Sequence, residues 1–162
     1  MRLILIRHGK AEKESDSGRD EDRELLPRGR RQSRYLADEL TAGKRMRPRR
    51  LLASGFTRAR QTAQIIAAQL DLEVEHAPVL EIGHGVAAAI ELIEKLLRSG
   101  EQGPIAFVGH NPQLEHLAGV LLHGPTGMES MRTGEAVILD LPDSKPVGRA
   151  ELVTRLRLAE DD

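Results

Sequence analysis

The sequence predicts an α/β fold: a three-layer sandwich with a mostly parallel central sheet and helices on both of its faces. Short apolar runs alternate with segments of helical spacing along the chain, which is the pattern of such a sandwich. The runs Arg2–Arg7 and Pro104–Gly109 are continuously apolar between their ends, as in strands buried on both faces. With 162 residues the chain has the length of one domain, so we expect residues 1–162 to form a single domain.

The first half of the chain is expected to hold three strands and two helices. Pro27 suits the first turn of a helix, and the apolar side chains that follow it keep helical spacing until Gly43. The charged segment from Glu12 to Glu24 is expected to be an exposed loop, and whether it orders on substrate binding stays open. The elements in order are a strand Arg2–Arg7, a helix from Pro27, a strand Arg49–Ala53, a helix with its apolar stripe from Ala59 to Leu70, and an edge strand Glu73–Ala77.

The second half continues the alternation and then changes to two strands. Asn111 is a natural N-cap and Pro112 a natural first helical residue, so a helix is expected from there to about Leu122. Alternating side chains predict the last two strands, which a turn around Pro142 to Gly148 separates. The elements in order are a helix Ala87–Leu97, a strand Pro104–Gly109, the helix after Pro112, and the strands Glu135–Leu141 and Glu151–Leu158.

Residues suited to bind phosphate lie at or just after the ends of three predicted strands. Arg7 and His8 end the first strand, Arg58 comes shortly after the second, and His110 directly follows Pro104–Gly109. Parallel strands end on the same side of a sheet, and ligands bind beyond their carboxyl ends. We therefore expect these four side chains to converge in one crevice.

Such a crevice would be a strongly cationic site for a dianionic phosphate. The planar fork of an arginine matches two phosphate oxygens, and the helix that starts at Asn111 would add backbone N–H groups. A histidine there can attack phosphorus in line and form a covalent phosphohistidine. The other cations would neutralise the charge that spreads over the equatorial oxygens. This chemistry needs no metal and no cofactor.

Composition excludes several other classes of function. The chain has no cysteine, which removes disulfides, thiolate zinc sites and a cysteine nucleophile. A net charge of −1 and the near absence of aromatic residues argue against binding to nucleic acid. No apolar stretch approaches the roughly 18 residues of a membrane helix, so we expect a cytoplasmic protein that does not bind membranes. The remaining histidines lack the spacing of a metal site.

Three sequence segments together resemble one known family. Arg7–Gly9 resembles the R-H-G signature of the histidine phosphatase superfamily, which has the phosphoglycerate-mutase-like fold. Ser54–Thr62 is similar to the family's S-x-x-x-R-A-x-Q-T segment, and Val108–Pro112 to the segment that carries its second active-site histidine. Each segment alone is a weak signal, but all three occur in the family's order and each follows a predicted strand.

The resemblance implies roles for individual residues. His8 corresponds to the nucleophile, Arg58 to a phosphate ligand, and His110 to the second active-site histidine, with Arg7 beside them. A general acid is less clear: Glu81 lies about where many relatives place a proton-donating carboxylate. Such an acid would protonate a poor alkoxide leaving group, whereas an imidazole leaving group needs it less.

Within the superfamily the chain looks most like the short phosphohistidine phosphatases of the SixA type. Arg23–Gly29 resembles that subgroup's R-P-L-T-x-x-G segment, but it has Glu24 for the usual proline and Leu26 for the usual threonine. Arg23 is therefore a candidate for a substrate contact, and Asn111, where the helix with free backbone N–H groups is expected to start, is a second candidate. The short stretch between Arg58 and His110 leaves no room for the lid that other members carry, and an open site suits a phosphorylated protein side chain.

Three functions follow as alternatives. The first is a metal-independent phosphatase that removes phosphate from phosphohistidine in a histidine phosphotransfer domain or another signalling protein. The second keeps the mechanism but acts on a small phosphate ester, for which Glu81 would matter more. The third is a module that binds phosphate without turnover, against which the intact set of nucleophile and cations argues. The sequence leaves the physiological substrate and the oligomeric state open.

Overall fold

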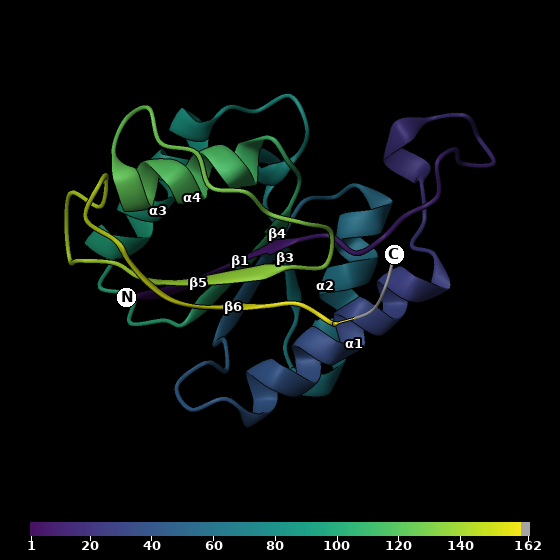
Figure 1. Ribbon diagram of the computed structural model, residues 1–162, viewed down its shortest axis with the longest axis horizontal. Coiled ribbons are helices and arrows are strands. Elements are labelled where there is room, and N and C mark those ends of the chain that lie inside the picture. The colour runs from purple at the N-terminus through teal and green to yellow at the C-terminus, as the bar shows by residue number, and fades with distance from the viewer. Residues whose placement is uncertain (160–162) are drawn as a thin grey trace.

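Within residues 1–159, which the computed structural model describes, six strands form one sheet in the order β3-β2-β4-β1-β5-β6 (Figure 1). The strands are β1 Arg2–Arg7, β2 Arg50–Ala53, β3 Val74–His76, β4 Ile105–Gly109, β5 Ala136–Asp140 and β6 Glu151–Leu156. The helices are α1 Pro27–Ala42, α2 Thr57–Leu70, α3 Val86–Arg98 and α4 Gln113–His123, with short 3-10 turns at Asp20–Asp22 and Pro78–Leu80. In this part of the chain no helix is long and apolar enough to span a membrane.

Four neighbouring strands of the sheet run parallel. β2 pairs with β3 and β4, and β4 pairs with β1, so that Leu5 lies opposite Phe107 and Ala53 opposite Val108. β5 pairs antiparallel with β1, and β6 pairs antiparallel with β5. The predicted mostly parallel sheet is therefore confirmed, and β1, β2 and β4 all end at the same edge.

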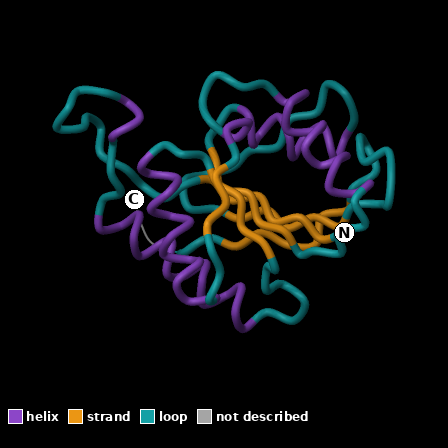
Figure 2. Tube along the Cα trace, turned by 180° about the vertical axis from the view of Figure 1, so that it is seen from behind, coloured by secondary structure: helices purple, strands orange, loops and turns teal. Residues whose placement is uncertain are grey.

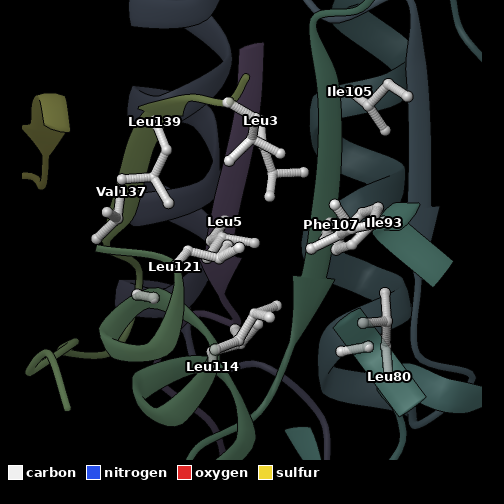
Figure 3. Close-up of a cluster of buried hydrophobic side chains, with 14 of the residues drawn as sticks. Leu3, Leu5, Leu80, Ile93, Ile105, Phe107, Leu114, Leu121, Val137 and Leu139 are labelled. Atoms are coloured by element: carbon white, nitrogen blue, oxygen red, sulfur yellow. The ribbon is translucent and has the colours of Figure 1, made fainter. Parts of the chain in front are cut away.

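Helices cover both faces of the sheet, as predicted. Successive side chains of a strand point to opposite faces, so Ile4 and Ile6 pack against α1 and α2 while Leu3 and Leu5 pack on the side of α3 and α4. Figures 1 and 2 show the strands between the two helical layers. Figure 3 shows the cluster on the second of these faces, with Leu5 of the sheet close to Leu121 of α4, and Phe107 beside Ile93 of α3.

The start of α4 differs from the prediction. The helix begins at Gln113 and has Pro112 in the N-cap position with no side-chain cap, so Asn111 is not its N-cap. The Asn111 amide instead donates from Nδ2 to the Met131 carbonyl oxygen at 2.8 Å, a contact with a distant loop. The turn is closed by the backbone, since the Leu114 N–H donates to the His110 oxygen at 3.0 Å. The other predicted elements lie within two residues of the observed bounds.

The charged loop that follows β1 is tied to the body of the protein at its base. A β-bridge joins Ala11 to Leu25, and the Glu12 N–H donates to the Glu24 oxygen at 2.8 Å. Beyond this base the loop projects from the body, where Figure 1 draws it in purple with its short helical turn. That turn contains Asp20, which accepts a hydrogen bond from Arg58 in the first turn of α2.

Candidate active site

The carboxyl ends of β1, β2 and β4 open into a pocket of about 300 Å³. Six of the seven residues predicted from the sequence as site residues line this pocket, and Glu81 does not. Its walls consist of Arg7, His8, Lys10, Ala11, Lys13, Arg23, Arg58, Ile82, His110, Asn111 and Thr133. The expected convergence of distant segments is therefore observed, and the functions of these residues stay predictions.

The backbone after β1 is held on both sides, which positions His8. Its N–H donates to the Gly109 oxygen at 3.1 Å, and its carbonyl accepts from the Gly134 N–H at 2.9 Å. The next residue has no space for a side chain, because a Cβ at Gly9 would lie 2.6 Å from the Gly29 oxygen at the start of α1. The Gly9 N–H also donates to Oγ1 of Thr62 in α2 at 3.1 Å. The glycine of the R-H-G segment thus lets two helices pack against the strand end.

His8 is 7% exposed, and the hydrogen bond of its Nδ1 identifies which ring nitrogen is unprotonated. Nδ1 lies 2.8 Å from the Gly9 carbonyl oxygen, which can only accept, so Nδ1 carries the proton. In the neutral ring Nε2 then keeps its lone pair. The Arg58 Nε donates toward this Nε2 at 3.4 Å. The arrangement leaves a nucleophilic nitrogen beside a cation.

Arg58 stands in the first turn of α2 and is only 3% exposed. Its Nη1 donates to the Asp20 carbonyl oxygen at 2.8 Å and its Nη2 to the Asp20 Oδ2 at 3.1 Å. Arg23 also donates to Asp20, from Nη1 to Oδ1 at 2.8 Å. These hydrogen bonds, that of Arg23 first, lower the pKa of the Asp20 carboxyl. The two arginines therefore already bind one carboxylate between them, which shows that their geometry suits an anion.

Arg7 and Asn111 approach the pocket from β1 and from the turn before α4. Both donate to the Met131 carbonyl oxygen, Arg7 from Nη1 at 3.1 Å and Asn111 from Nδ2 at 2.8 Å. Burial lowers the pKa of Arg7. The Arg7 Nε and the Asn111 Oδ1 have no hydrogen-bond partner within residues 1–159. Two residues that line the pocket thus each hold a buried polar atom, one donor and one acceptor, without a partner in the described part of the chain.

His110 follows β4, is 2% exposed and lies next to His8. The two ring centroids are 5.2 Å apart, with an angle of 57° between the planes. The rings of Phe56 and His110 pack in a T-shaped arrangement, with their centroids 5.2 Å apart. The His110 Nε2 lies 2.8 Å from Oγ of Ser54, the residue that follows β2. Contacts from two strand ends therefore fix this second histidine in place.

Burial keeps both histidines neutral at neutral pH. Desolvation, which disfavours the charged ring, lowers the pKa of His8 to about 4 and that of His110 to about 3. The nearby Arg58 and Arg7 act in the same direction on both rings. A neutral His8 retains the lone pair that nucleophilic attack requires.

An NMR titration tests this protonation state. We expect the ring signals of His8 and His110, assigned with His8→Ala and His110→Ala, to stay constant from about pH 8 to about pH 5. Unfolded histidine has a pKa of about 6.5, so between that pH and about 4 the unfolded chain binds protons that the folded protein does not. The free energy of unfolding should therefore fall as the pH is lowered through this window. A titration midpoint near pH 6.5 for either ring would show that burial does not lower the pKa of that histidine.

Glu81 lies outside the pocket of His8 and is engaged elsewhere. Its Oε2 accepts hydrogen bonds from the ring of His76 and from the Gly55 N–H, the latter at 3.0 Å. The His76 contact is the main cause of the lowered pKa of this carboxyl. Glu81 lines a neighbouring pocket of about 260 Å³, which shares Ile82, His110 and Asn111 with the first. The lowered pKa means that the Glu81 carboxyl favours its ionised form.

The structure adds residues that the sequence did not single out. Lys10 and Lys13 add charge to the pocket wall, Asp20 holds Arg58 and Arg23, and Ser54 holds His110. Ser54 belongs to the recognised segment, so it could have been considered. Asp20 gave no signal, because nothing local distinguishes it from the other acids of its loop. Within residues 1–159 no group of three or more His, Asp or Glu side chains is arranged to hold a metal ion.

Comparisons with known protein sequences identify the family of the chain. A model of the histidine phosphatase superfamily (branch 1) matches residues 3–88. An uncharacterized protein of Picosynechococcus sp. (strain ATCC 27264 / PCC 7002 / PR-6) is 33% identical over 132 residues, which cover 78% of this chain and 76% of that protein.

Solved structures extend the likeness over more than nine tenths of the chain. The protein histidine phosphatase SixA, solved with tungstate, is 25% identical with a TM-score of 0.83 and 97% of both chains covered. A mycobacterial glucosyl-3-phosphoglycerate phosphatase, solved with VO3, is 20% identical with a TM-score of 0.75, covering 94% of this chain and 97% of its own, and shows the shared fold alone. The chain therefore belongs to branch 1 of the histidine phosphatase superfamily, as a phosphatase of the SixA type.

Proposed function

We propose that this phosphatase is a metal-independent phosphohistidine phosphatase that forms a covalent intermediate on His8. One observation carries the proposal: the bond from the His8 Nδ1 to the Gly9 oxygen, at 2.8 Å, leaves an unprotonated Nε2 in a pocket lined by five cationic side chains. These are Arg7, Lys10, Lys13, Arg23 and Arg58. A nucleophile is of no use to a module that only binds phosphate, so the pocket favours turnover.

In the first step the His8 Nε2 attacks phosphorus and a new N–P bond forms. The P–N bond to the target imidazole breaks, and its electron pair stays on that imidazole nitrogen. Arg58, Arg7 and a donor on His110 stabilise the charge of the equatorial oxygens in the transition state. In the second step a water oxygen bonds to phosphorus, the bond to the His8 Nε2 breaks, and inorganic phosphate leaves with the protons of the water.

The surroundings of Glu81 support an imidazole rather than an alkoxide as the leaving group. An imidazole that carries a proton on its other nitrogen departs as a neutral molecule and needs no general acid. An alkoxide needs a proton, but within residues 1–159 no Asp or Glu lines the pocket of His8. The nearby Asp20 carboxyl has a lowered pKa and accepts from Arg58 and Arg23. The carboxyl of Glu81 is occupied by His76 and Gly55. We therefore assign no proton transfer to Glu81 in the proposed reaction.

A phosphorylated protein is the proposed partner, in the form of a histidine phosphotransfer domain. Between α2 and β4 lie 34 residues, of which α3 takes 13, and Ile82 is the one residue of this stretch that lines the pocket. The pocket is open beside Lys10, Lys13 and Arg23, which can receive a phosphorylated side chain that projects from a folded domain. The small-ester alternative is kept because Glu81 borders the adjoining pocket.

A parallel assay of substrates tests the proposal. The purified protein, with EDTA present, is incubated with a phosphohistidine-bearing phosphotransfer domain, with p-nitrophenyl phosphate and with several sugar phosphates. We expect fast loss of phosphohistidine and slow turnover of the esters. The reverse preference would show a small-ester phosphatase. If no substrate were turned over, the remaining alternative would be a module that binds phosphate without turnover.

The variant Glu81→Gln tests the leaving group within the same assay. Because the carboxyl donates no proton in the proposed reaction, we expect phosphohistidine turnover to change by less than about 3-fold. The amide keeps an oxygen that can accept from the Gly55 N–H, which limits damage to the loop. A loss on the order of 100-fold or more, for esters and phosphohistidine alike, would make Glu81 the general acid and overturn this assignment.

A further inference from the structure

Ser54 makes the only hydrogen bond to the His110 ring that is found within residues 1–159. The His110 Nε2 lies 2.8 Å from the Ser54 Oγ, while Nδ1 is buried without a partner in this part of the chain. With Nε2 occupied, Nδ1 is the one ring nitrogen left for a phosphoryl oxygen. The distance does not tell which of the two atoms donates in the pair, since both groups can donate or accept.

The second contact of Ser54 decides the direction of that bond. Its Oγ accepts from the Phe56 N–H at 3.1 Å, and the residue is 1% exposed, so bulk water does not reach the hydroxyl. If the His110 Nε2 were also a donor, one oxygen would receive two N–H groups. The buried hydroxyl proton would then have no acceptor within residues 1–159, at a cost of about 1–3 kcal/mol for an unmade buried hydrogen bond.

The opposite direction satisfies every group. The hydroxyl donates to a bare His110 Nε2 and accepts from the Phe56 N–H. The His110 ring then carries its proton on Nδ1, because a neutral imidazole has one N–H. Burial keeps the ring neutral, with a pKa of about 3, so this choice between tautomers exists at neutral pH.

We propose that Ser54 is a positioning residue that holds His110 as the Nδ1–H tautomer, so that this histidine offers a proton to the phosphoryl group. The inference rests on the proposed function. The two histidines then have complementary roles: His8 presents the lone pair of Nε2 to phosphorus, and His110 presents the N–H of Nδ1 to an oxygen. Each state is set by a partner behind the ring, the Gly9 carbonyl in one case and the Ser54 hydroxyl in the other.

Tautomers are read directly by long-range ¹H–¹⁵N correlation spectra of the histidine-labelled full chain at neutral pH. We expect the wild-type His110 to show a protonated Nδ1 and a bare Nε2. Ser54→Ala should shift the ring toward a mixture or toward Nε2–H, and Ser54→Thr, which keeps a hydroxyl, should restore the wild-type pattern. Ser33→Ala is the control, since it removes another buried hydroxyl, one that bonds the Gly29 oxygen in α1.

Kinetics on the phosphohistidine substrate give the second measurement. We expect Ser54→Ala to lower kcat by roughly 10- to 100-fold with KM little changed, and Ser54→Thr to recover most of the rate, because a lost tautomer acts mainly on the chemical step. A wild-type spectrum with the proton on the Nε2 of His110 would overturn the proposal. A Ser54→Ala variant in which both the His110 tautomer and kcat are unchanged would overturn it as well. If the wild type turned over no substrate, the proposed function would fail, and the spectrum alone would still decide the role of Ser54.

Discussion

Replacing His8 with alanine should reduce phosphohistidine turnover to the rate measured without enzyme, a loss of at least about 10⁴-fold. The loss should be this large because, in the proposed mechanism, the Nε2 of His8 forms the bond to phosphorus. The arginines that line the pocket remain, so the variant should still bind inorganic phosphate. Burst kinetics and recovery of alkali-stable, acid-labile phosphate on the wild-type protein measure the intermediate itself.

His123→Ala is the matched control for this prediction. That histidine lies at the end of α4, where its ring contacts Glu129, and it does not line the pocket. We expect its turnover to stay within about 2-fold of the wild type. Near-native turnover by His8→Ala would show that the reaction does not pass through a phosphorylated His8.

Replacing Arg58 with alanine should cost about 3 to 4 kcal/mol of transition-state stabilisation, or roughly 100- to 1000-fold in kcat/KM. The guanidinium is buried, lies 3.4 Å from the His8 Nε2 and already holds the two oxygens of Asp20 that face it. A buried charge acts more strongly on a phosphoryl group than an exposed one, because water does not screen it. Arg58→Lys should recover part of the loss, since it keeps the charge but not the planar fork.

Arg60→Ala is the control for Arg58→Ala, because it removes an exposed arginine from the same turn of α2. We expect kcat/KM to change by less than about 2-fold. Thermal unfolding of both variants should be compared, since Arg58→Ala also leaves Asp20 without one of its two arginines. Equal losses in the two variants would mean that Arg58 acts through general charge rather than as a ligand of the phosphoryl group.

The order of the elements could be predicted because it depends on local pattern. The apolar run of Arg2–Arg7 and the helical spacing after Pro27 each reflect which face of an element is buried, and this information is carried by neighbouring residues. The start of α4 was predicted wrongly for the same reason. Asn111 is a good N-cap by local rules, but its Nδ2 donates to the carbonyl of Met131, which is twenty residues away. Its Oδ1, the atom that would accept in a cap, has no partner within residues 1–159.

The sequence by itself determined the family, the α/β sandwich and the convergence of the strand-end residues Arg7, His8, Arg58 and His110, because strand ends and short motifs are local properties. Only the tertiary structure decided the chemical state of the pocket. In the folded protein Asp20 pairs with Arg58, and the carboxyl of Glu81 contacts His76. Each of the rings of His8 and His110 has a hydrogen-bond partner at one of its nitrogens. Ionisation and tautomer depend on burial and on groups distant in the chain, so they are fixed only once the chain has folded.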